Sequence, residues 1–87
     1  MSTSDSDAVL KAYEDFSVLW YWALLPANVR ARAIQVRLAD PDADRFGWWE
    51  DFAVNCDFAA RKLGYASLRA CLLSVGVPAT DELGNLI

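Results

Sequence analysis

Residues 48–63 read Trp-Trp-Glu-Asp-Phe-Ala-Val-Asn-Cys-Asp-Phe-Ala-Ala-Arg-Lys-Leu, and this stretch decides the fold class. On a helical wheel its aromatic and small apolar residues fill one arc, while the acids, the bases and Asn55 fill the other. The pattern predicts an amphipathic helix that starts after an acidic turn, with Asp40 or Asp44 as its cap, and ends at Gly64.

Two further helices are predicted before this stretch. The first takes Ser6 or Asp7 as its cap, because these side chains accept hydrogen bonds from free backbone N–H groups, and it runs to about Leu24. Its last two turns are apolar on all sides, so we expect other elements to cover them on two sides. The second helix takes Pro26 as its first residue and runs to about Ala39.

The segment 29–38 within the second helix has a split pattern. Polar residues separate two apolar stripes, which consist of Val29, Ala33 and Val36 and of Ala31, Ile34 and Leu38. The same residues alternate at a period of two, which leaves a bulged strand open. Alanine and arginine favour a helix, and no partner strand is recognisable elsewhere. We therefore favour a helix, with a solvent-exposed edge formed by Arg30, Arg32 and Arg37.

A fourth helix is predicted over Leu68–Val75. Ser67 is its cap, and Gly76 ends it because glycine adopts the left-handed conformation that closes many helices. Thr80–Leu83 can add one short helical turn beyond it.

The chain is long enough for one domain. Its 87 residues are 55% hydrophobic and 23% charged, which predicts a folded core rather than a disordered chain. We therefore expect an all-α fold, a small compact bundle of about four helices joined by short turns, as a single domain over residues 1–87. Residues 1–6 are expected to form a flexible polar tail, and residues 84–87 a short C-terminal tail.

The composition also limits the chemistry. Histidine, the commonest general base and metal ligand, is absent from the sequence, and no glycine-rich phosphate loop occurs. We therefore expect no enzyme, no cofactor and no small-molecule substrate. Cys56 and Cys71 fall on apolar helical faces, where we expect reduced, buried thiols. The acidic turn at residues 40–44 is similar to the start of a calcium loop, but the sixth position, which needs glycine, is Arg45, so we favour a turn over a metal site.

Charge and hydropathy limit the partners and the location. The formal net charge of −4 disfavours nonspecific binding to nucleic acid or to anionic membranes. The longest apolar run, Val18–Leu25, has eight residues, well below the roughly 20 that span a membrane. The polar start of the sequence has no signal-peptide pattern. We therefore expect a cytoplasmic protein with neither a membrane nor a nucleic acid as its partner.

Val54 and Phe58 break the pattern of the third helix. They lie one turn apart within its charged arc, ringed by Asp51, Asp57, Arg61 and Lys62. A small apolar cluster with a polar rim is typical of a protein interface. The alternative is that the pair packs on another helix of the same bundle, and we favour a partner or a dimer contact.

Val18 and Trp22 form a second candidate patch, in the first helix. Lys11 and Asp15 lie on the same strip of the helix and would form its rim. A bundle of four helices needs some helix to be buried on two sides, so core and interface explain this pair equally well.

Residues 59–77 open with Ala-Ala-Arg-Lys-Leu-Gly and close with Gly-Val. This pattern, which covers about a fifth of the chain, resembles a helix-turn-helix of the Fis type. The resemblance implies DNA binding through Arg61, Lys62 and Arg69. The turn before Leu68 is about two residues shorter than in that family, and the recognition helix carries a single base. A plain helical hairpin explains the same residues.

The supply of aromatic bulk favours binding over chemistry. Four tryptophans, three tyrosines and four phenylalanines exceed what the core of so small a domain can bury. We therefore expect a non-catalytic module that docks onto a larger protein or protein complex, and a homodimer is a second use of the surplus surface. Size and composition are similar to those of inhibitors and accessory factors from phages or mobile elements, such as anti-CRISPR proteins. The alternative is a DNA-binding transcriptional regulator that uses residues 59–77.

Overall fold

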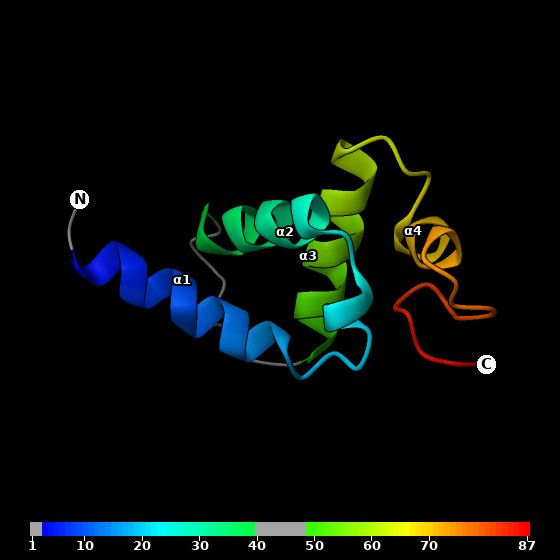
Figure 1. The fold of residues 1–87 in the computed structure, drawn as a ribbon, viewed down its shortest axis with the longest axis horizontal. Helices are drawn as coiled ribbons and strands as arrows, with labels where there is room; N and C mark the ends of the chain where they lie inside the picture. Colours follow the sequence, from blue (N-terminus) through cyan, green and yellow to red (C-terminus); the bar gives the residue numbers. More distant parts are fainter. Residues whose placement is uncertain (1–2, 40–48) are drawn as a thin grey trace.

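The helix predicted from residues 48–63 lies at the centre of the fold (Figure 1). A computed structural model describes residues 3–39 and 49–87, and in it α3 spans Trp49–Lys62. Of the other three α-helices of this part of the chain, each contacts α3, and α2 contacts it most extensively. The end of α3 agrees with the prediction, whereas its predicted caps at Asp40 and Asp44 lie outside the described residues.

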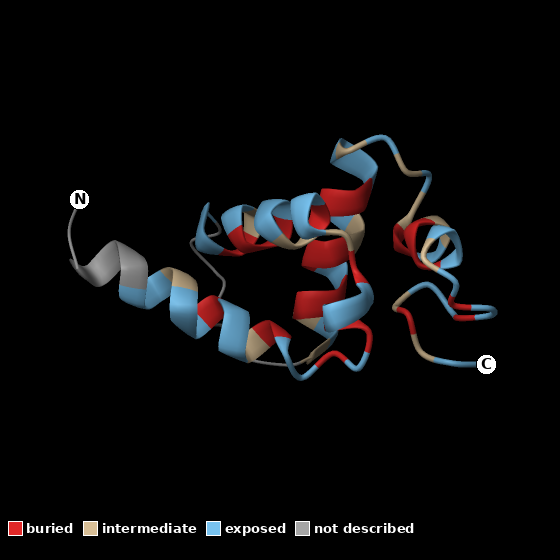
Figure 2. Cartoon of the chain, viewed as in Figure 1, coloured by how far each residue is buried: buried red, intermediate tan, exposed pale blue. Residues whose placement is uncertain are grey.

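The described residues form an all-α fold, as predicted. The order is α1 (Thr3–Phe16), the short 3₁₀ helix η1 (Trp22–Leu24), α2 (Ala27–Ala39), α3 and α4 (Leu68–Ser74). The described residues contain no strand. They contain one isolated antiparallel bridge, between Thr80 and Leu86. The molecule measures 40 × 24 × 19 Å, and α1 runs along its long axis (Figure 1). Most of the α1 residues from Asp7 to Phe16 are exposed (Figure 2).

Small side chains explain why α2 and α3 pack so extensively. Ala53, Cys56, Ala59 and Ala60 of α3 are completely buried, and so are Val29 and Ala33 of α2, which belong to the same core cluster. Short side chains let two helix backbones approach closely, and close packing maximises dispersion contacts.

Residues 29–38 are helical, so the bulged strand is wrong. The buried residues of α2 recur at helical spacing, at Val29, Ala33, Ile34 and Arg37. Arg37 was expected on a solvent-exposed edge, but it is buried, and its guanidinium lies 4.5 Å from the centre of the Phe52 ring. Pro26 precedes the helix, and its carbonyl accepts a hydrogen bond from the Arg30 backbone N–H at 3.0 Å.

The prediction for the first helix is wrong at both ends. The helix already begins at Thr3, so residues 3–6 are not a tail. It ends at Phe16 instead of Leu24, because the Ser17 hydroxyl donates to the Glu14 carbonyl and the backbone tightens, with the Leu19 N–H donating to the Phe16 carbonyl at 3.0 Å. The turns that follow bury four large side chains, Leu19, Tyr21, Trp22 and Leu25. A single helix would have carried the whole apolar run 18–25 on all its sides, with exposed apolar residues wherever no other element covers it.

Aromatic rings join the first helix to the core. The Trp22 ring stacks on Phe16, with 4.7 Å between the ring centres, and Phe16 lies 5.0 Å from Phe52 of α3. The edge of Tyr13 meets Trp22 at 5.9 Å. These offset and tilted contacts are the arrangements that aromatic pairs prefer.

The segment from Thr80 to Leu86 folds back onto the body of the protein. The Trp20 indole N–H donates to the Gly84 carbonyl at 3.0 Å, and the Tyr21 hydroxyl donates to the Leu83 carbonyl at 2.9 Å. The predicted helical turn at 80–83 is therefore a hydrogen-bonded loop, and residues 84–86 are not a free tail. Backbone N–H groups that donate to the Asp81 carboxylate hold the loop together and lower the pKa of that group.

Both cysteines are free and completely buried, as predicted. Cys56 on α3 and Cys71 on α4 belong to the same core cluster, and burial raises the pKa of both thiols. The thiols thus act as small apolar side chains.

Gly84 and Gly76 offer a matched test of the docked C-terminal loop. Both have a positive φ, +85° and +96°, but a Cβ added at Gly84 lies 2.4 Å from the Tyr21 ring, whereas nothing lies within 4 Å of one added at Gly76. We expect Gly76→Ala to lower the free energy of unfolding by about 1 kcal/mol through backbone strain, and Gly84→Ala by about 2–4 kcal/mol through strain and the clash. Urea unfolding followed by circular dichroism measures both, and equal losses would contradict the contact with Tyr21.

Candidate docking surface

The outer face of α3 carries the predicted apolar pair. We define this face as Val54 and Phe58 with the charged residues around them, namely Glu50, Asp51, Asp57, Arg61 and Lys62. Val54 is 54% exposed and Phe58 is 48% exposed. They lie opposite the buried arc of Ala53, Cys56 and Ala60, which faces the core, so the described helices leave them uncovered.

Lys62 partly covers the apolar pair. Its ammonium group lies 5.2 Å from the centre of the Phe58 ring, within the range of a cation–π interaction. At an exposed site this contact is worth only about 0.5–1 kcal/mol, so a partner can displace the lysine from the ring at small cost.

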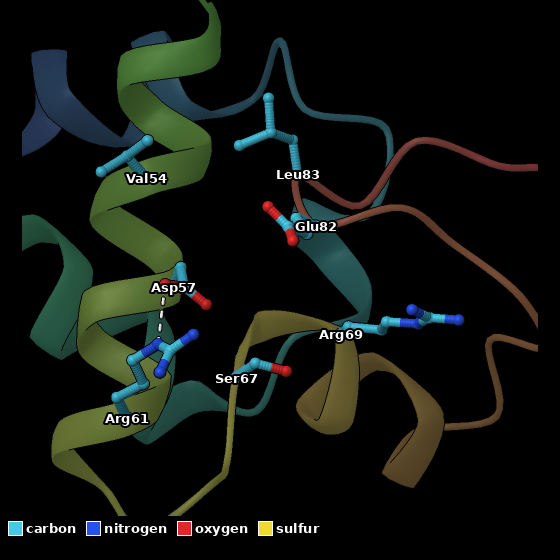
Figure 3. A pocket seen from close by; sticks show the side chains of 7 residues that line it. All are labelled: Val54, Asp57, Arg61, Ser67, Arg69, Glu82 and Leu83. Atoms are coloured by element: carbon cyan, nitrogen blue, oxygen red, sulfur yellow. Dashed lines mark hydrogen bonds and ion pairs between the residues drawn. The ribbon is translucent and has the colours of Figure 1, made fainter.

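Asp57 links α3 to the start of α4. One carboxylate oxygen accepts from the Arg61 side-chain Nε at 2.9 Å (Figure 3). The other accepts from the Leu68 backbone N–H at 2.8 Å. The Ser67 hydroxyl oxygen, the predicted cap, accepts from the Ala70 N–H at 3.1 Å. Asp57 therefore has a structural role in addition to its place in the rim. The sequence pattern gave no means of predicting this structural role.

A cleft of about 390 Å³ adjoins this face, between α3, the start of α4 and the C-terminal loop. Its lining consists of Val54, Asp57, Arg61, Ser67, Arg69, Glu82 and Leu83. Val54 and Leu83 form an apolar end, whereas Arg61 and Ser67 lie at the other end (Figure 3). Glu82 and Leu83 line the cleft only because the loop is docked on Trp20 and Tyr21, and the sequence gave no signal for this.

Asn55 was expected among the polar residues of α3, but it is buried. Its side-chain oxygen has no hydrogen-bond partner among the described residues. Asn55 lies one turn after the buried Phe52, and its burial makes the polar arc of the helix narrower than the pattern predicted.

The second predicted patch does not exist as a unit. Trp22 is 7% exposed and packs in the core against Phe16, while Val18 is 61% exposed. The cause is the end of α1 at Phe16, which takes the two residues out of one helical strip. Lys11 and Asp15 still form an exposed ion pair on α1, at 3.3 Å.

Of the three basic residues of the DNA-binding alternative, Arg61 and Arg69 line the same cleft, and Lys62 is not among its lining residues. Arg61 is paired with Asp57, Lys62 lies over Phe58, and in Figure 3 the Arg69 side chain extends away from Arg61. The second helix of the expected pair, α4, has seven residues. A recognition helix needs several side chains that reach base edges, so the hairpin offers little for DNA readout.

Residues 3–39 and 49–87 contain neither a candidate metal site nor a candidate membrane span. No group of histidine, cysteine, aspartate and glutamate side chains there could hold a metal ion, and the acidic turn at 40–44 lies outside these residues. No helix in this part of the chain has the length and apolar character needed to cross a membrane. Comparisons with protein-family models, curated proteins and solved structures find no match.

Asp57 and Arg61 allow the two roles of the rim to be separated. We expect Asp57→Ala to lower the free energy of unfolding by about 1–2 kcal/mol, because it leaves the Leu68 N–H without its acceptor. Arg61→Gln removes only the ion pair, whose partners are 27% and 59% exposed, and should cost no more than about 0.5 kcal/mol. Thermal and urea unfolding measure both variants. A larger loss for Arg61→Gln than for Asp57→Ala would show that the contact with Leu68 does not stabilise the fold.

Proposed function

We propose that this chain is a non-catalytic protein-binding module that docks onto a larger protein through the outer face of α3. The observation that carries the proposal is the exposure of Val54 and Phe58 on the central helix, whose own packing uses the opposite side. Fully burying a side chain of this size is worth about 1.5–3 kcal/mol, which makes the pair a suitable anchor for a partner.

The surroundings of the pair support docking rather than chemistry. The charged rim provides hydrogen-bond donors and acceptors at the edge of an apolar centre, the usual composition of a protein interface. The cleft beside it can receive a further partner side chain, with its apolar part on Val54 and Leu83. The chain has no histidine, and both oxygens of Asp57 are already engaged by donors within the protein.

A narrower role, as an inhibitor or accessory factor from a phage or mobile element, remains a prediction from size and composition. The identity of the captured protein decides it. A cytoplasmic location remains a prediction in the same way.

The test is an affinity capture with three versions of the full chain. Wild type, Phe58→Asp and Leu10→Asp are immobilised, and bound proteins are identified by mass spectrometry. Leu10 is an exposed leucine on α1, at 62%, so it is a matched control for an added charge on exposed apolar surface. We expect one protein to bind wild type and Leu10→Asp but to bind Phe58→Asp at least about tenfold less, because the charge would have to be desolvated in the interface.

Two outcomes would contradict this proposal. Equal capture by all three versions would place the docking surface elsewhere, provided that circular dichroism shows each variant folded. Tight, salt-sensitive binding to duplex DNA in a gel shift, lost on Arg69→Glu, would favour the DNA-binding alternative.

A further inference from the structure

The outer face of α3 has an order of charges that complements its own reverse. Two of its acids, Glu50 and Asp51, lie at the N-terminal end of the helix, and its bases, Arg61 and Lys62, lie at the C-terminal end. The third acid, Asp57, is engaged within the chain by Arg61 and by the Leu68 N–H. Val54 and Phe58 lie between the two charged ends, at equal distances in sequence from the midpoint of the face. A helix turned end over end therefore places acid against base at both ends and apolar against apolar in the middle.

We propose that a second copy of the chain covers this face, with the two α3 helices packed antiparallel about a two-fold axis. At 3.6 residues per turn, Glu50 and Arg61 lie on one flank of the Val54–Phe58 stripe, and Asp51 and Lys62 lie on the other. A two-fold axis perpendicular to the plane of the helix pair brings each flank against the same flank of the second copy. Glu50 then faces Arg61 of the second copy, Asp51 faces its Lys62, and Val54 faces its Phe58.

The self-complementary order singles out a second copy as the occupant. An isologous interface needs a surface that matches itself under a two-fold rotation. The outer face of α3 meets this need, because all three of these pairings form in the same register of the two helices. The helix dipole alone favours acids at the start of a helix and bases at its end. The dipole does not account for the exposed Val54 and Phe58 between the charged ends, because exposed apolar side chains cost free energy in a lone chain.

The contact is small, which sets the expected affinity. A helix of 14 residues is about 21 Å long, so one helix pair buries less than the roughly 1,200–2,000 Å² of a standard interface. Exposed ion pairs add little each and are screened by salt. We therefore expect a weak dimer, with a dissociation constant of about 10 µM to 1 mM, that loosens as salt rises.

This inference rests on the proposed function for its surface, because the dimer and the larger protein would use the same face. The two would compete, so the dimer would keep the apolar pair covered until the larger protein binds. A monomeric wild type would overturn the dimer alone, and the capture experiment with Phe58→Asp would still decide the proposed function.

The test is a charge exchange followed by sedimentation velocity on the full chain, from about 10 µM to about 1 mM. Asp51→Lys and Lys62→Glu each turn two attractive contacts of the dimer into repulsive ones, and we expect each variant alone to dimerise at least about tenfold more weakly. In a mixed dimer of the two variants, the introduced lysine faces the introduced glutamate, and the unchanged Lys62 faces the unchanged Asp51. An equimolar mixture should therefore restore association. Lys11→Glu, which changes the net charge as Lys62→Glu does but lies on exposed α1, should dimerise like wild type.

Three results would overturn the proposal. They are a monomeric wild type over the whole range, a dimer unaffected by both reversals, and a mixture that does not restore association. Circular dichroism checks the fold of each variant. If Asp51→Lys loses helix, Glu50→Lys replaces it, with Arg61→Glu as its counterpart in the mixture.

Discussion

The packing of α2 against the small residues of α3 is the contact on which the rest of the structure depends. Ala53, Cys56, Ala59 and Ala60 have side chains too short to hold a neighbouring helix away, so one side of α3 is completely buried. Phe52 extends this contact at one end, where it meets Phe16 and Arg37. Because α3 uses this side for the core, Val54 and Phe58 have to face outward. The docking surface is thus a direct consequence of how the core is built.

The aromatic loop between α1 and α2 connects parts of the chain that are far apart in sequence. Trp22 joins the core, while Trp20 and Tyr21 next to it hold the C-terminal loop by donating to the carbonyls of Gly84 and Leu83. Burial raises the pKa of the Tyr21 hydroxyl, which stays a hydrogen-bond donor over the physiological range. The docked loop supplies one wall of the cleft beside Val54, so the core and the candidate surface share these contacts.

Local patterns in the sequence were enough to predict the helices and the apolar pair on α3. The α4 helix, with its cap at Ser67, was predicted nearly to its ends, because its signals lie within a few residues of one another. The end of α1 could not be predicted in this way. Residues 18–25 are apolar on every side, so the pattern does not say which of them the core takes. The core takes Leu19, Tyr21, Trp22 and Leu25 and leaves Val18, Trp20 and Leu24 exposed. The burial of Asn55 and Arg37, the bond from Leu68 to Asp57 and the docking of the C-terminal loop likewise depend on contacts between distant segments.

The most direct test of the central claim is hydroxyl-radical footprinting of Phe58, with Phe52 as a buried reference in the same helix. Phe58 is 48% exposed and Phe52 is 7% exposed, so in dilute solution we expect Phe58 to be oxidised much faster. As the chain associates, with a second copy or with a captured protein, the oxidation of Phe58 should slow while that of Phe52 stays slow. Equal, slow oxidation of both rings in dilute protein, or a rate for Phe58 that association leaves unchanged, would contradict a docking role for the outer face of α3.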